Sequence, residues 1–242
     1  MRIIFSRKGF DSSSGGGASP IIKGKPVSLP IPAKHVSQTT YNDLGLGELV
    51  NLSSRGQIKG SHFCHYDPMF TDQGQCFFGQ CGAAQTHLER QGVCEGDVFL
   101  FFGLFRDFQN GGEPHHRIFA YLEVEKVMPL ADEVPQELLA LSHPHALAMH
   151  HKNDVVYRGP GKMAVCASDA LRLTVLGGPL TLWERPCWLR RGGLSYHDKK
   201  ERWVRGGLLK SVARGQEFVA DIGRKSAARE WLGRILDEIR GF

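Results

Sequence analysis

The feature that most restricts the fold of this chain is a continuous apolar and aromatic run, Val98–Phe105. Its length is that of a buried strand, and Gly96-Asp97 before it is a turn signal. A Gly/Asn loop at 109–112 leads to a second strand, 117–127, whose second half alternates apolar and charged residues. Such alternation is typical of a half-exposed antiparallel strand. We therefore expect a long central hairpin over residues 96–127.

The remaining pattern predicts one α+β domain spanning residues 1–242. Residues 1–5 read as a strand, and Ser226–Arg240 reads as a helix whose apolar residues share one face that can pack onto a sheet. Further helices are expected at 41–52, 82–90 and 134–141, and short strands at 155–157, 163–166 and 171–175. The expected architecture is a mainly antiparallel, partly barrel-like sheet with a C-terminal packing helix.

Composition restricts the class of protein more than its activity. A hydrophobic fraction of 41% in 242 residues is enough for a buried core. No stretch approaches the roughly 18 apolar residues of a membrane span. The six cysteines form no C-x-x-C pair and no signal peptide precedes them, which favours free thiols in a cytoplasmic protein. The formal charge of +5 is compatible with nucleic-acid binding without being diagnostic of it.

The first forty residues predict a strand followed by a long ligand-binding loop. The loop combines cations, hydroxyls, a carboxylate and several glycines, and its candidate residues are Ser6, Arg7, Lys8, Asp11, Ser13 and Gly15. Glycines let backbone N–H groups approach a ligand, and successive amides can form an anion-binding nest. The loop matches neither the Walker A motif nor a dinucleotide fingerprint. We interpret it as a phosphate-binding loop, with Asp11 as a candidate catalytic residue; the alternative is a flexible Gly/Ser segment.

Histidines and carboxylates form further candidate groups. In His62-x-x-His65-x-Asp67, two imidazoles and a carboxylate could bind a divalent ion, but the spacing matches no strong zinc signature. We therefore assign no metal site and keep His65 and Asp67 as candidate catalytic or ligand-binding residues. A second cluster, with His143-Pro144-His145 and His150-His151, could transfer protons or could be a surface loop.

Two more segments carry polar residues around glycines. Gln80 lies in a glycine–amide–glycine turn that enters the predicted helix containing His87, and such a turn is an ordinary anion site. Arg214 and Gln216 could bind a phosphate and a base or sugar, and Glu217 beside them could be a general base or part of a buried ion pair. For the turn at Gln80 the alternative to an anion site is structural, because the small residues at 82–84 would also suit close packing of the helix on the sheet.

The segment from 185 to 214 is basic and contains aromatic residues. Phosphates could be neutralised there while bases stack. The candidate nucleic-acid-binding residues are Arg190, Arg191, Tyr196, His197 and Trp203. A solvated basic surface is an equally good interpretation of this segment alone.

Nine stretches taken together resemble the third nucleotide-modification-associated domain family of bacteria and phages. They are Ser6–Asp11, Ala18–Ile21, Ser28–Pro32, His65–Pro68, Gly79–Ala84, Gly96–Gly103, His143–His145, Leu194–His197 and Arg214–Val219. The resemblance covers nearly the whole chain. It implies an association with modification of nucleic-acid bases or nucleotides, and it specifies no reaction.

A second resemblance is local. Gly96-Asp97, the aromatic strand and Ile118–Val124 look like the central hairpin of pseudouridine-synthase-and-archaeosine-transglycosylase (PUA-like) barrels and their base-reading EVE-like relatives. Those barrels bind RNA or modified DNA bases in a pocket. Ala120 stands where a glycine would be more usual, and the long N-terminal loop has no counterpart there.

Two main functions follow as hypotheses. The first is an enzyme, a transferase or hydrolase, that modifies nucleotides or DNA bases and grips phosphate with its N-terminal loop. The alternative is a non-catalytic reader of modified nucleic acid. The expected partner is a nucleotide or nucleic acid, DNA being favoured, together with other modification enzymes. The density of polar loop residues favours the enzyme. The sequence specifies neither the base, the donor group, a cofactor nor the oligomeric state.

Overall fold

The predicted hairpin lies at the centre of the protein. The computed structural model describes residues 1–212 and 217–242. In it, β8 (Val98–Asp107) pairs antiparallel with β9 (His115–Glu123), with an irregularity in register between Phe101 and Phe102. The first strand, β1 (Arg2–Arg7), lies parallel to β8 on its other side. The prediction of a central hairpin is confirmed.

The sheet extends from this hairpin in both directions and curls into a half-barrel. Its main path runs β15-β1-β8-β9-β11-β7-β6, and most neighbouring strands are antiparallel. The outer strands are β15 (Glu217–Asp221), β11 (Val155–Met163), β7 (Gln75–Gln80) and β6 (Met69–Phe70). Off this path, β10 (Lys126–Pro129) pairs with β11, and β2 (Ser19–Ile22) pairs with β8 and with β3 (Lys25–Pro26). This is the α+β, mainly antiparallel, partly barrel-like domain that the sequence predicts.

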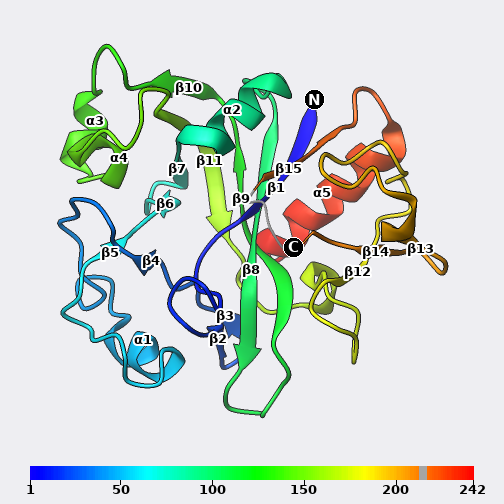
Figure 1. The fold of residues 1–242 in the computed structure, drawn as a ribbon, viewed down its shortest axis with the longest axis horizontal. Helices are drawn as coiled ribbons and strands as arrows, with labels where there is room; N and C mark the ends of the chain where they lie inside the picture. Colours follow the sequence, from blue (N-terminus) through cyan, green and yellow to red (C-terminus); the bar gives the residue numbers. More distant parts are fainter. Residues whose placement is uncertain (213–216) are drawn as a thin grey trace.

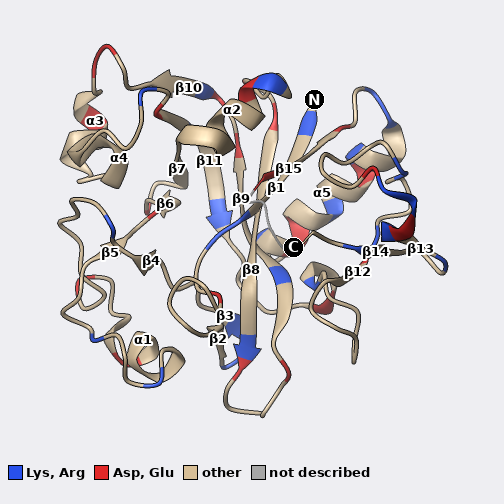
Figure 2. Cartoon of the chain, in the orientation of Figure 1, with Lys and Arg blue, Asp and Glu red and all other residues tan. Residues whose placement is uncertain are grey.

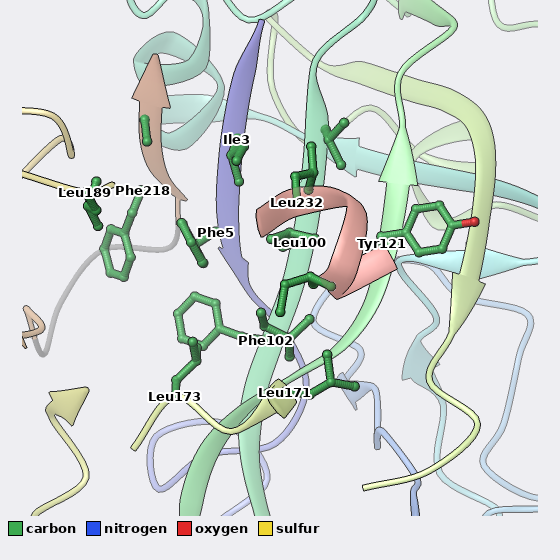
Figure 3. Close-up of a cluster of buried hydrophobic side chains, with 14 of the residues drawn as sticks. Ile3, Phe5, Leu100, Phe102, Tyr121, Leu171, Leu173, Leu189, Phe218 and Leu232 are labelled. Carbon is green, nitrogen blue, oxygen red and sulfur yellow. The ribbon is translucent and has the colours of Figure 1, made fainter. Parts of the chain in front are cut away.

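Both faces of the central strands are buried, which explains why β8 is continuously apolar. Leu100 and Phe102 face a cluster that includes Ile3, Phe218 and Leu232 (Figure 3). The alternate residues of β8, Phe99 and Phe101, belong to a second cluster on the other face of the sheet. A strand with an apolar layer on each side reads as an unbroken hydrophobic run.

Helices and small sheets cover the two sides of the central strands (Figure 1). One side carries α5 (Ser226–Arg240) and a three-stranded sheet of β12 (Leu182–Glu184), β13 (Trp203–Val204) and β14 (Leu208–Lys210). The other carries α1 (Gly47–Ser53), α3 (Gln136–Ala140), α4 (Pro144–Leu147) and the small sheet of β4 (Ile31–Pro32) and β5 (Cys64–His65). The remaining elements are α2 (Gly82–Arg90) and two 3-10 turns, η1 (Asp169–Leu171) and η2 (Lys200–Arg202).

The sequence predicted α5 and α2 at their observed bounds but misjudged several shorter elements. The predicted strand 117–127 is interrupted after β9, and β10 pairs with β11 instead of β8. The predicted helix 41–52 begins only at Gly47, because Gly45 has a φ of 67° that a helix does not allow. Segment 171–175 forms no strand: Leu171 ends η1, and Arg172 and Thr174 form isolated bridges. The 6–40 loop contains β2, β3 and β4, whose partner strands are distant in sequence or too short to recognise.

The cysteines and the helices bear on two further expectations. All six cysteines are free thiols. Burial raises the pKa of the Cys64 thiol to about 12 and that of Cys76 well above its usual range. These two thiols are therefore inert core residues. Among the helices in the described ranges, none has the length and apolar character needed to cross a bilayer.

Candidate functional site

A pocket of about 670 Å³ gathers candidate site residues from several separate segments of the chain. It lies between the N-terminal loop, the β4–β5 region, the junction of β7 with α2, and the segment after α3. Nine candidate residues line it: Arg7, Lys8, Asp11, Ser13, His65, Asp67, Gln80, His145 and His150. A larger cavity of about 970 Å³ near the tip of the β8–β9 hairpin contains none of the predicted residues. We therefore treat the smaller pocket as the candidate site.

Asp67 is a fixed carboxylate in one wall of this pocket. Its Oδ1 accepts a hydrogen bond from the backbone N–H of Gly79 at 2.8 Å and lies 3.5 Å from Nε2 of His143. The Nδ1 of His143 accepts from the backbone N–H of His145 at 3.3 Å, so Nε2 is the ring nitrogen that faces Asp67. The second carboxylate oxygen, Oδ2, lies 3.8 Å from Nε2 of His65.

His145 is held by a second buried carboxylate. Its Nδ1 is hydrogen-bonded to Oδ1 of Asp154, and the backbone N–H of His150 donates to Oδ2 of Asp154 at 2.9 Å. The His145 ring lies 5.3 Å from the ring of His65 and 4.3 Å from that of His150. A carboxylate on Nδ1 fixes both the tautomer and the orientation of an imidazole, so Nε2 is the nitrogen available for chemistry.

The local electrostatics keep the carboxylates ionised and His65 neutral. Burial alone would raise the pKa of Asp67, but the hydrogen bond from His143 and the neighbouring imidazoles lower it to about 2. Burial would likewise raise the pKa of Asp154, yet its bonds to His145 and His150 hold it far below the usual range. Burial lowers the pKa of His65 to about 4, although Asp67 opposes the shift. At neutral pH this wall therefore presents carboxylate oxygens and an uncharged imidazole.

A second polar group lies behind the part of the lining that contains Lys8 and Gln80. Glu217 on β15 is 1% exposed, and its Oε1 accepts hydrogen bonds from Ser6 (3.1 Å), Lys8 (3.2 Å) and Gln80 (2.7 Å). The ammonium of Lys8 also lies 4.2 Å from the centre of the Phe78 ring. One buried carboxylate thus connects β1, the N-terminal loop, β7 and β15. Glu217 lies behind the pocket lining and positions Lys8 and Gln80 within it.

The N-terminal loop is shaped by Asp11 and Gly15. Oδ1 of Asp11 accepts from the backbone N–H groups of Ser13 (2.8 Å) and Ser14 (2.7 Å) and from the Ser13 hydroxyl (2.8 Å). Gly15 has a φ of 95°, and a Cβ there would lie 2.4 Å from the Phe10 ring. The carboxylate therefore closes a turn, and Gly15 serves the packing of Phe10 instead of lining the pocket.

A family profile for nucleotide modification associated domain 3 matches residues 2–221. The chain belongs to this family. The match includes every candidate site residue and ends at Asp221, the last residue of β15, before α5 begins. All residues that line the pocket therefore lie within the matched range. No curated protein and no solved structure matches the chain. The family name points to nucleotide modification and leaves the reaction open; the PUA-like resemblance stays a prediction.

Within this domain, the turn into α2 differs from the anion site expected there. The backbone N–H of Gly82 already donates to Oδ1 of Asn153 at 2.7 Å, and that of Cys81 donates to the side chain of Gln80 at 3.1 Å. The Gln80 amide is therefore engaged at both ends, by Cys81 and by Glu217. His87 lies away from the pocket lining, with Nε2 3.1 Å from the Ser195 hydroxyl. In this arrangement the Gln80 side chain connects Glu217 with the backbone of Cys81 and so stabilises the pocket wall.

The basic segment presents only part of its predicted nucleic-acid-binding set. Arg190 and Arg191 are exposed, and Tyr196 is half exposed and packs on His87. His197 is fully buried and its Nε2 accepts from the backbone N–H of Val212, so its side chain is not part of the exposed surface. Trp203 is partly buried, and its indole N–H donates to the His197 carbonyl. Figure 2 shows acidic and basic residues side by side around β13.

Three further residues were candidates from the sequence, and two residues of the site were not. Arg214 and Gln216 lie outside the described residues. His62 is exposed and its Nδ1 accepts from the backbone N–H of Lys59, so it does not join His65 and Asp67. His35 lines the pocket against His150, with the rings 4.5 Å apart, and sequence reasoning did not single it out. Asp154 was also missed, although its position four residues after His150 was a signal.

Proposed function

We propose that this protein is an enzyme that modifies a nucleotide, either free or as a base flipped out of DNA, in the pocket described above. The observation that carries the proposal is the presence of two unlike groups of side chains in one pocket. Arg7 and Lys8 provide cations, and His65, Asp67 and His145 provide oriented imidazoles and a carboxylate. A nucleotide has the matching halves, a phosphate and a base or sugar. The volume of about 670 Å³ also lies in the usual range for small-molecule sites.

The residues divide into contact and positioning roles in this proposal. Arg7 and Lys8 bind phosphate oxygens, since an ammonium has three donors and the bond to Glu217 uses one. Asp11 and Glu217 position the loop and Lys8 through the hydrogen bonds given above. The His65–Asp67–His145 wall carries the chemistry, because groups held by buried carboxylates are preorganised for it.

A reader of modified nucleic acid is the second candidate function. The observation that favours it is the exposed surface of Arg190, Arg191 and Tyr196, where a phosphate backbone and a base could be bound outside the pocket. A reader needs this surface and a pocket, but it needs no oriented acid or base. The two functions therefore differ in their dependence on Asp67.

Mass spectrometry of nucleosides tests the proposal. DNA, RNA and free nucleotide pools would be analysed from cells that express the wild-type chain, Asp67→Asn or His62→Ala. An enzyme predicts a nucleoside that appears or disappears with the wild type and His62→Ala and not with Asp67→Asn. Identical profiles for wild type and Asp67→Asn, with DNA binding retained by both and lost on changing Arg190 and Arg191 to Ala, would replace the enzyme with the reader.

A further inference from the structure

We propose that His65, Asp67 and His145 form a binding site for one divalent transition-metal ion, such as Zn²⁺. One ligand atom from each residue lies within 4.8 Å of the other two. Two ligands of a tetrahedral ion with bonds of about 2.1 Å lie roughly 3.4 Å apart, so small side-chain movements close the set. His65 Nε2 and Asp67 Oδ2, already 3.8 Å apart, approach this spacing.

The donor set suits such an ion. Two imidazoles and one carboxylate are ligands of zinc and of other first-row divalent ions, whereas Mg²⁺ and Ca²⁺ prefer oxygen alone. The three residues lie on the wall of the pocket, so the remaining coordination positions face the space where a substrate or water would enter. Three protein ligands with an open position are characteristic of catalytic sites, and structural zinc sites are closed by four.

The surroundings of the three ligands provide an independent argument. Asp154 binds Nδ1 of His145 and leaves Nε2 for the ion, which is the carboxylate–histidine–metal arrangement. Asp67 has Oδ1 engaged by Gly79 and His143, and this leaves Oδ2 directed to His65. Each of these two ligands is therefore held by a buried partner that orients its free atom. A surface cluster of histidines has no such second layer.

The histidine that joins His65 and Asp67 in the structure is not the one that the sequence spacing suggests. The sequence spacing His62-x-x-His65-x-Asp67 offers His62 as the third ligand, but His62 is exposed and engaged elsewhere. The third ligand is instead His145, brought beside Asp67 by the packing of its ring against Gly79. His62→Ala is thus a matched control for His145→Ala. Any catalytic role of the ion rests on the proposed function, whereas its binding does not.

Titration of the purified full-length protein with Co²⁺ tests the proposal, because its visible absorption reports the ligand geometry directly. We expect one equivalent of Co²⁺ to bind per chain and Zn²⁺ to displace it. Asp67→Asn and His145→Ala should each weaken binding at least 100-fold, and His62→Ala should leave it unchanged. Asp154→Asn, which keeps all three ligands, should weaken binding about 10- to 100-fold through the lost orientation of His145.

Folding of each variant would be checked first by circular dichroism and a thermal melt without metal. A second measurement covers a variant that is destabilised: Zn²⁺ should raise the Tm of the wild type and His62→Ala and not that of Asp67→Asn. Absence of stoichiometric Co²⁺ binding by the wild type would overturn the proposal. So would equal losses in His62→Ala and His145→Ala. Neither measurement uses a nucleotide, so this result is separate from the nucleoside profiles that test the proposed function.

Discussion

Single residues fix the geometry of the pocket, and Gly79 is one of them. A Cβ at this position would lie 2.3 to 2.7 Å from three atoms of the His145 imidazole. The backbone of Gly79 also donates to Asp67, so one residue touches two of the three proposed ligands. Only glycine lets the His145 ring approach β7 this closely.

We therefore expect Gly79→Ala to displace His145 and to weaken Co²⁺ binding at least about tenfold. Gly233→Ala is the control, because a Cβ there has open space within 4 Å and the residue lies in α5. That control should leave Co²⁺ binding unchanged and should not lower stability, since alanine is the better helix former. Equal Co²⁺ affinity in Gly79→Ala and the wild type would contradict this account of His145.

Glu217 is the second residue on which the pocket depends. Removing it leaves the largely buried Lys8 ammonium and the Gln80 amide without their shared acceptor. We expect Glu217→Ala to lower the free energy of unfolding by about 3–5 kcal/mol, as for other broken buried pairs. Urea denaturation would measure it. The half-exposed pair Arg158–Glu137 is the control, and Glu137→Ala should cost under about 1 kcal/mol. Similar losses in the two variants would show that burial of the Lys8–Glu217 pair is not decisive.

At the scale of elements, α5 is stabilised by its apolar face. Ile235 is 4% exposed and belongs to the cluster that joins α5 to β1, β8 and β15 (Figure 3). Ile235→Ala should lower the free energy of unfolding by about 2–5 kcal/mol because it leaves a cavity. Arg234→Ala, on the exposed side of the same helix, should change it by less than about 0.5 kcal/mol. Denaturant unfolding of both variants measures the difference, and a small loss for Ile235→Ala would mean that α5 packs loosely.

The elements also show how far sequence reasoning reaches. The central hairpin, α2 and α5 were predictable because their signals are local: an apolar run between turns, a glycine after a helix, an apolar stripe. The strands inside residues 6–40 were not, since β2 pairs with β8 about 85 residues away. The pocket was predictable only in part, because some of its residues belong to local motifs and others meet only through tertiary packing. The N-terminal loop and His65-x-Asp67 are recognisable as motifs, whereas the contact of His145 with Asp154 and its approach to Gly79 depend on tertiary packing.

At the scale of the whole molecule, buried neutral histidines make stability depend on pH, and His116 is one of them. It is 8% exposed, and its Nδ1 accepts from the indole N–H of Trp183 at 3.2 Å. Burial, and then the charge of Arg7, lower the pKa of His116 from 6.5 to about 4, while a hydrogen bond from the protonated ring to the Leu180 carbonyl and then the charge of Asp11 oppose the shift. Nearby His115 adds a small effect in the same direction as Arg7. The folded protein therefore resists protonation of His116 until well below the pH at which the unfolded chain accepts it.

The direction in which stability changes with pH follows from the protons that the folded and the unfolded chain bind at His116. Between pH 6.5 and about 4 the unfolded chain binds a proton at this position that the folded chain does not. Stability is then fully present above pH 6.5 and is lost as the pH falls toward 4, by up to about 3 kcal/mol for a shift of this size. The low pKa of Asp67 acts in a different pH window, because its contribution to stability is lost only as the pH falls below 3.8 toward about 2.

Urea unfolding of the wild type from pH 7.5 to 4.5 should show this decline in stability. His116→Asn keeps an acceptor near Trp183 without an imidazole, so its slope with pH should be shallower even if its stability at pH 7.5 is lower. Parallel slopes for the two proteins would mean that other groups cause the acid sensitivity and that His116 is protonated in the folded state.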